Sequence, residues 1–178
     1  MKLALFIDGV HLFSAARSLG FEIDYKQLLA WGAAQGDLVR AHYYTPISTR
    51  EDDHIPLQPL VDWLDYNGYA VTTKDVREYA DSEGRKKVKG NINIELAMDM
   101  IDMAPYVDRA ILFSGDGDLW RLVESVQRKG VRVTVASTIK TSPAMVADDL
   151  RRQADCFLDI DNIKEIRKPA RTMAAVGK

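Results

Sequence analysis

The chain of 178 residues has 47% apolar and 28% charged residues and a net charge of −2, which is typical of a globular protein. This length favours one domain that buries a core without disulfides or a structural metal. The small net charge excludes a globally basic surface, and the single cysteine, Cys156, excludes an internal disulfide and Cys-rich zinc motifs. Any nucleic-acid site must therefore be a local patch.

Short apolar runs alternate with amphipathic segments along the chain. In order, the patterns predict a strand at 3–8, a helix at 25–34, a strand at 38–44, a helix at 55–66, a strand leading into extended chain at 69–79, a loop or hairpin tip at 81–87, a helix at 92–103, a strand at 109–114, a helix at 118–129, a strand at 131–136, a helix at 143–154 and a strand at 156–160. This alternation is typical of a parallel sheet covered on both faces. We therefore predict one α/β domain over 1–162 with a mostly parallel sheet, and a basic, disordered tail over 163–178.

The sequence contains no apolar run of about 18 residues, so we expect no membrane span. The apolar run 3–7 is too short for a signal peptide and lacks a small-residue cleavage site. A cytoplasmic protein is therefore the expectation. Cys156 stands in the apolar run 156–158, where we expect it to be a buried small hydrophobe.

Acidic residues follow two of the predicted strands. Asp8 ends the first strand, and Asp116 and Asp118 stand in the run Ser-Gly-Asp-Gly-Asp at 114–118. Because sites in open parallel sheets form outside the carboxyl ends of the strands, these carboxylates meet if the two strands are neighbours. Clustered carboxylates repel one another or bind a cation, and their oxygens suit Mg²⁺ or Mn²⁺. The plain alternative is that Asp8 only ends a strand and Asp118 only caps a helix.

A basic segment lies between the two acidic motifs. Lys86, Lys87 and Lys89 precede the predicted helix at 92–103. Beside a carboxylate cluster these lysines are candidates to hold phosphates, although a solvated loop has the same composition. Arg121, one turn after the acidic run, is a candidate for the same role or an ordinary surface arginine.

The helix at 92–103 carries polar groups near its start. Asn93 and Glu95 lie roughly 160° apart around a helix, so only one of them can face the acidic edge. Glu95 and Asp99 are four residues apart and share a face, which a solvated helix would also show. If this helix crosses the acidic edge of the sheet, the Asp99 side chain would be partly directed toward that edge.

Three motifs of the chain resemble one family. They are Phe-Ile-Asp-Gly-Val-His-Leu at 6–12, Lys-Gly-Asn-Ile-Asn at 89–93 and Ser-Gly-Asp-Gly-Asp-Leu at 114–119. They resemble the NYN domain, in the LabA-like (DUF88) branch of the PIN-domain nuclease superfamily. Residues 150–160 are similar to the closing helix and strand of that branch, and the resemblance covers about residues 2–162 in the same order.

The resemblance implies a PIN-like three-layer α/β/α sandwich and a Mg²⁺- or Mn²⁺-dependent ribonuclease that hydrolyses RNA phosphodiester bonds. It implies metal ligands at Asp8, Asp116 and Asp118. With the residues above, the expected catalytic set is Asp8, Asn93, Asp99, Asp116 and Asp118, and the expected nucleic-acid contacts are His11, Lys86, Lys87, Lys89, Ser114 and Arg121.

Two positions depart from the family's pattern. His11 stands where the family usually has Asn, and an imidazole can still donate a hydrogen bond or contact phosphate. Asn93 stands where the family usually has Asp, and its amide is a weaker ligand that removes one negative charge. Three explanations stay open: Glu95 or Asp99 compensates, this copy is weakened, or the substitution is engineered.

Other functions fit the sequence less well. A non-catalytic module that binds RNA or a protein partner on the same edge is the main alternative, and Asn93 favours it. A haloacid dehalogenase-type phosphotransferase would need a second Asp at the position of Val10. A Toprim-like site would need Glu in place of Asp8, and no Gly-x-Gly-x-x-Gly motif follows the first strand.

The expected partner is RNA, on the family resemblance. We expect single strands, because Tyr43, Tyr44 and Trp120 are candidates to stack bases, with core packing as the alternative for these aromatic rings. The sequence leaves a homodimer open.

Overall fold

The computed structural model describes residues 1–47, 57–89 and 91–169 of the chain. Its centre is a six-stranded sheet in the order β3-β2-β1-β6-β7-β8, and every neighbouring pair is parallel. The strands are β1 (Lys2–Asp8), β2 (Asp37–Ile47), β3 (Tyr69–Asp75), β6 (Arg109–Phe113), β7 (Arg132–Ser137) and β8 (Cys156–Asp159). The predicted α/β class with a parallel sheet is confirmed.

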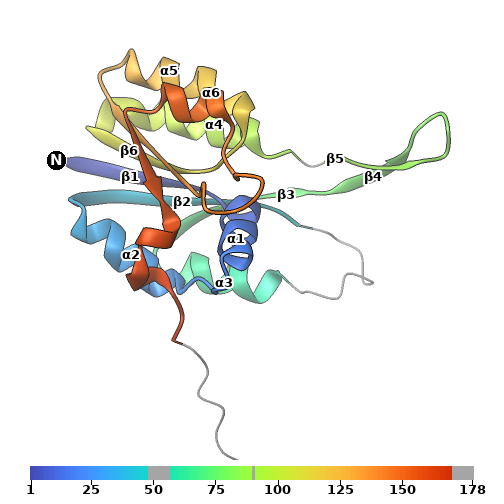
Figure 1. Cartoon of the computed structure of the whole chain (residues 1–178), viewed down its shortest axis with the longest axis horizontal. Helices are drawn as coiled ribbons and strands as arrows, with labels where there is room; N and C mark the ends of the chain where they lie inside the picture. The colour runs from blue at the N-terminus through green and yellow to red at the C-terminus, as the bar shows by residue number, and fades with distance from the viewer. Residues whose placement is uncertain (48–56, 90, 170–178) are drawn as a thin grey trace, which may run out of the picture.

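Helices cover both faces of the sheet and make three layers (Figure 1). One face carries α1 (Gly9–Ser18), α2 (Tyr25–Ala34) and α3 (Gln58–Tyr66); the other carries α4 (Asn93–Met103), α5 (Trp120–Gln127) and α6 (Asp148–Gln153). Short 3₁₀ turns are η1 (Ala104–Tyr106), η2 (Gly117–Leu119), η3 (Ile160–Asn162) and η4 (Lys164–Ile166). None of the helices in the described part of the chain is long and apolar enough to cross a membrane.

Alternate side chains of β1 pack into two separate hydrophobic cores, one on each face of the sheet. Leu5 and Ile7 pack toward α1 and α2, whereas Ala4 and Phe6 pack toward α4 and α5. All four are fully buried, as expected for a central strand of a sheet covered on both faces. The sheet is therefore a rigid platform for residues that follow its strand ends.

A small hairpin extends from the body next to the end of β3. It pairs β4 (Arg77–Ala80) with β5 (Lys86–Lys89) in antiparallel register, and it projects from the end of the sheet where the parallel strands finish (Figure 1). The strand predicted to lead into extended chain at 69–79 corresponds to β3 and most of β4. The predicted hairpin tip at 81–87 overlaps the turn and the start of β5.

Two helices differ from the sequence prediction. The helix α1 was not predicted, although Asp8 caps it and Leu12, Ala15 and Ala16 bury a helical stripe. The predicted helix at 143–154 is reduced to α6, because the preceding backbone bonds elsewhere: Met145 N donates to Thr138 O at 3.0 Å and Ala147 N donates to Gly115 O at 3.0 Å.

Two expectations near the end of the chain are wrong. Cys156 is exposed, and it is the first residue of β8, the edge strand of the sheet. Ordered structure continues past 162: Ile163 and Ile166 are buried, and Ile166 O accepts a hydrogen bond from Asp24 N at 2.7 Å. Disorder is therefore not found as far as residue 169, and the rest of the predicted tail, 170–178, lies outside the described residues.

Candidate active site

The strand order reverses at the boundary between β1 and β6. From β1 the chain proceeds through β2 to β3 on one side of the sheet, and β6, β7 and β8 follow on the other. Such a switch point is where open parallel sheets bind ligands, outside the carboxyl ends of the strands. Ile7 and Phe113 are register partners, so Asp8 and the turn that carries Asp116 leave adjacent strands side by side.

Asp8 joins the strand end to a helix start. Its backbone is extended and its carboxylate Oδ1 accepts a hydrogen bond from His11 N at 3.1 Å. Burial raises the pKa of the Asp8 carboxyl above its usual value; the bond from His11 lowers it, and the negative charge of Asp116 raises it. The two carboxylates are therefore close enough to repel each other.

Asp116 is held by three neighbours. Its Oδ1 accepts from Asp118 N at 2.9 Å, its Oδ2 accepts from Asn93 Nδ2 at 2.6 Å, and its own N–H donates to Ser114 Oγ at 3.3 Å. Asn93 is the first residue of α4, where Asn91 Oδ1 accepts its backbone N–H at 2.8 Å. The amide of Asn93 thus places a donor on a carboxylate where the family pattern expects a second carboxylate.

Two glycines permit the close approach of backbones around these acids. A Cβ on Gly9 would lie 2.4 Å from Tyr43 Cζ, and one on Gly115 would lie 1.8 Å from Met145 O and 2.7 Å from His11 Cε1. Side chains at these positions would push apart the elements that carry the acids.

His11 links the acidic edge to β7. Its Nε2 lies 2.9 Å from Ser137 Oγ, and that hydroxyl donates to Met145 O at 2.8 Å. Since the hydroxyl proton is used, Nε2–H is the donor of the first bond. Burial lowers the pKa of His11, while the charges of Asp8 and Asp116 raise it, and the net shift is downward. Burial therefore favours the neutral form of the imidazole.

The acids on α4 face away from the Asp8–Asp116 pair. Glu95 Oε1 lies 2.8 Å from Lys74 Nζ of β3, and Asp99 Oδ2 accepts from Tyr44 OH at 2.9 Å. Asn93 alone of this helix start reaches Asp116, as expected for residues on opposite faces. Asp99 and Glu95 therefore already have partners, and among the described residues neither forms a hydrogen bond with Asp8 or Asp116.

The remaining expected site residues lie around the same edge. The side chain of Asp118 is exposed, and its backbone rather than its carboxylate contacts Asp116. Ser114 is fully buried and shapes the turn. Arg121 lies over the Trp120 ring at 5.2 Å and pairs with Glu124 at 2.6 Å. The side chains of the three expected lysines, Lys86, Lys87 and Lys89, lie outside the described part of the structure.

The donor set suits a hard divalent cation in part. Within the described residues, no group of at least three His, Cys, Asp or Glu side chains is arranged to hold a metal. Mg²⁺ often takes only one or two protein carboxylates and keeps several waters, which the neighbouring Asp8 and Asp116 would satisfy. The Asn93 amide offers an oxygen only if it turns, since its nitrogen now faces Asp116. Asp118 as a ligand stays a prediction.

Comparison with known proteins assigns the fold to a family. The sequence pattern of the NYN domain matches residues 2–161. The chain belongs to the NYN domain family. This NYN domain is 32% identical over 167 residues to the "Low amplitude and bright protein LabA" of Synechococcus elongatus, a match that covers 92% of this chain and 86% of that protein.

A solved structure agrees with the assignment. A protein of unknown function from Vibrio parahaemolyticus is 28% identical to this NYN domain and superposes with a TM-score of 0.72, covering 94% of this chain and 96% of that one. NYN domains belong to the PIN-like nuclease superfamily, so the family supports a nuclease-type function related to RNA.

Proposed function

We propose that this NYN domain is a metal-dependent ribonuclease that hydrolyses RNA phosphodiester bonds at the Asp8–Asp116 edge. The observation that carries the proposal is the meeting of two carboxylates at the switch point between β1 and β6, close enough for the charge of Asp116 to raise the pKa of Asp8. Two buried carboxylates close together repel each other, and this repulsion is unfavourable unless a bound cation offsets it. The pair therefore supports a cation site at this edge.

The residues at the Asp8–Asp116 edge have different roles in the proposed reaction. Asp8 and Asp116 would hold Mg²⁺ or Mn²⁺, whose role is to lower the pKa of a bound water and stabilise the charge that develops on the phosphate. Backbone N–H groups of His11 and Asp118 fix one oxygen of each carboxylate. The neutral His11 ring, anchored on Ser137, keeps the α1 start against the Asp116 turn.

The surface beside this edge suits single-stranded RNA. Trp120 is 37% exposed and carries the Arg121 guanidinium over its ring, which offers a base-stacking surface next to a cation. Tyr43 and Tyr44 are buried and belong to the core, so we assign no base stacking to them.

Replacing Asp116 by Asn tests the proposal. We expect RNA cleavage with Mn²⁺ to fall by at least about 100-fold, because the metal contributes several kcal/mol to such reactions and 1.36 kcal/mol is tenfold in rate. Calorimetric titration with Mn²⁺ should show weaker binding. Asp65→Asn, an exposed aspartate of α3, is the matched control and should keep both properties. An Asp116→Asn protein that cleaves RNA at the unchanged rate would remove the carboxylate pair from the reaction.

The hydrogen bond from Asn93 to Asp116 favours a second candidate, a non-catalytic module that binds RNA or a protein on the same edge. The amide satisfies the Asp116 carboxylate without a cation, and it lowers the negative charge of the edge by one. This arrangement reduces the affinity for divalent ions, and hydrolysis with it.

Asn93→Asp separates the two candidates. A carboxylate at this position would repel Asp116, so the variant should be less stable in EDTA and should bind Mn²⁺ on the order of tenfold more tightly than the parent protein. Asn91→Asp is the control, because it adds the same charge two residues away and keeps its acceptor for Asn93 N. Increased RNA cleavage by Asn93→Asp supports the nuclease; tighter Mn²⁺ binding without cleavage of any RNA supports the binding module.

A further inference from the structure

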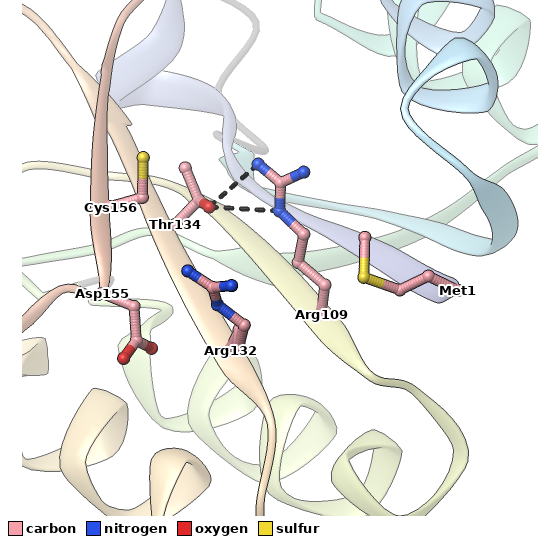
Figure 2. A pocket seen from close by; sticks show the side chains of 6 residues that line it. All are labelled: Met1, Arg109, Arg132, Thr134, Asp155 and Cys156. Carbon is pink, nitrogen blue, oxygen red and sulfur yellow. Dashed lines mark hydrogen bonds between the residues drawn. The ribbon is translucent and has the colours of Figure 1, made fainter.

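A pocket lies at the end of the sheet opposite the candidate active site, where β6, β7 and β8 begin (Figure 2). It encloses about 200 Å³ and is lined by Met1, Arg109, Arg132, Thr134, Asp155 and Cys156. Sites for drug-sized ligands usually enclose about 300–1,000 Å³. The smaller volume fits an ion or one functional group of a larger ligand.

Two arginines stand next to each other in this pocket. Arg109 of β6 and Arg132 of β7 are register partners on parallel strands, so their side chains leave the same face of the sheet. Neighbouring strands lie about 4.8 Å apart, and like charges in such a cross-strand pair destabilise a sheet. The pair therefore creates a local positive field that a bound anion would relieve.

Arg109 is held in place before any ligand arrives. Its Nε and Nη2 donate to Thr134 Oγ1 at 3.2 and 3.1 Å, as the dashed lines in Figure 2 show. Thr134 is only 2% exposed, so the acceptor is fixed within the sheet. One end of the guanidinium, Nη1, makes no hydrogen bond to the described residues and remains available. A fixed guanidinium loses less entropy when it binds.

The acid in the pocket does not neutralise the arginines. Asp155 Oδ2 accepts from Val133 N at 2.7 Å and from Gln127 Nε2 at 3.0 Å, which holds this carboxylate toward α5. Arg132 makes no hydrogen bond or ion pair with any described side chain. The lining therefore carries two guanidinium groups against one carboxylate that already has donors.

We infer that this pocket binds a phosphate group, either as inorganic phosphate or as the terminal phosphate of a small ligand. Paired guanidinium groups match the charge and geometry of a phosphate dianion better than those of a single carboxylate. The site is separate from the proposed nuclease edge and needs no divalent cation.

Phosphate binding is tested with the full chain in EDTA, at constant ionic strength so that general screening does not change. Isothermal titration with inorganic phosphate and, in a second arm, with adenosine monophosphate measures the affinity. Cys156 supplies a local readout, because it is the single cysteine, is exposed and lines the pocket. Phosphate in the pocket should slow its reaction with uncharged N-ethylmaleimide.

The variants are Arg132→Gln and Arg109→Gln, with Arg152→Gln as the matched control on α6, where Arg152 pairs with Asp148. Each pocket variant should weaken phosphate binding by about tenfold, the worth of one charge-assisted hydrogen bond, and should abolish the protection of Cys156. The exposed Arg132 tests the pocket without disturbing the buried Thr134.

Tighter binding of the nucleotide than of phosphate identifies a phosphomonoester ligand, and equal binding identifies the free ion. Absence of binding by the parent protein, or equal binding by all three variants, overturns the inference.

Discussion

Two charged pairs at opposite ends of the same parallel sheet, Asp8 with Asp116 and Arg109 with Arg132, are organised differently. At the carboxyl end, backbone N–H groups at the starts of α1 and η2 bond the carboxylates of Asp8 and Asp116. At the amino end, the Thr134 hydroxyl accepts both hydrogen bonds from Arg109, and Arg132 bonds no described side chain. The topology explains the contrast, because helices begin where parallel strands end, and helix N-termini favour anions while C-termini favour cations.

The two ends differ in how their charged side chains are held. The acidic end keeps its shape through the backbone and through Asn93, so its side chains are preorganised even without a cation. At the arginine pair, Arg132 has no ion-pair partner among the described residues, so the phosphate site inferred above would add contacts that the chain itself does not supply there. Substitutions at Gly115, Thr134 and Asp161 test this difference.

Gly115→Ala should damage the acidic end most. The new Cβ would meet Met145 O at 1.8 Å and the His11 ring, so the loop that follows β7 must move away from the Asp116 turn. Overpacking of this kind costs about 3 kcal/mol of the free energy of unfolding. Urea denaturation measures this loss of stability.

Gly130→Ala is the control. Gly130 has a φ of 87° and no atom near its Cβ position, so only about 1 kcal/mol of backbone strain is expected. Equal costs for the two variants would show that the turn at Gly115 is not tightly packed.

Thr134→Val should have a smaller effect, at the basic end. It keeps the volume of a buried side chain and removes the acceptor of both Arg109 bonds, which should lower the free energy of unfolding by about 1 kcal/mol. Chemical denaturation checks this value, with the exposed Thr73→Val as control. Phosphate affinity should fall as well, because the Arg109 guanidinium loses its anchor. An unchanged stability would mean that these hydrogen bonds are no better than those to water.

Asp161→Asn should have the smallest effect and one that depends on pH. Unlike Asp8, this carboxylate near the carboxyl end faces cations: the bond from Lys140, at 2.7 Å, followed by that from Arg167, lowers its pKa to about 2. A lowered carboxyl pKa stabilises the fold above the unfolded value near 3.8, and this stability is lost as the pH falls toward 2.

Thermal unfolding from pH 7 down to pH 2 measures the effect. The Asn variant should unfold at a lower temperature than the parent at pH 7, and the difference should shrink as the pH approaches 2. Asp37→Asn, an exposed aspartate without a side-chain partner in the described part of the chain, should show no such trend. A difference that is constant with pH would assign the effect to packing.

Much of the fold follows from local patterns in the sequence. The strands β1 and β6 are continuous apolar runs, and α2 has apolar residues at helical spacing. Both patterns are local, so these elements were predicted close to their observed bounds. The helix α1 was missed because its cap, Asp8, also ends a strand. Its signal was present in the spacing of Leu12, Ala15 and Ala16.

The apolar runs alone indicate that Asp8 and Asp116 follow strands, and parallel α/β topology then places such residues at one edge. Three contacts between residues distant in the chain are visible only in the folded protein: Asn93 with Asp116, His11 with Ser137, and Arg109 beside Arg132. These contacts depend on how α4 crosses the sheet and which strands become neighbours, and both are set by the packing of side chains far apart in the chain. Local periodicity contains no information about such distances, which is also why the exposure of Cys156 on an edge strand was not foreseen.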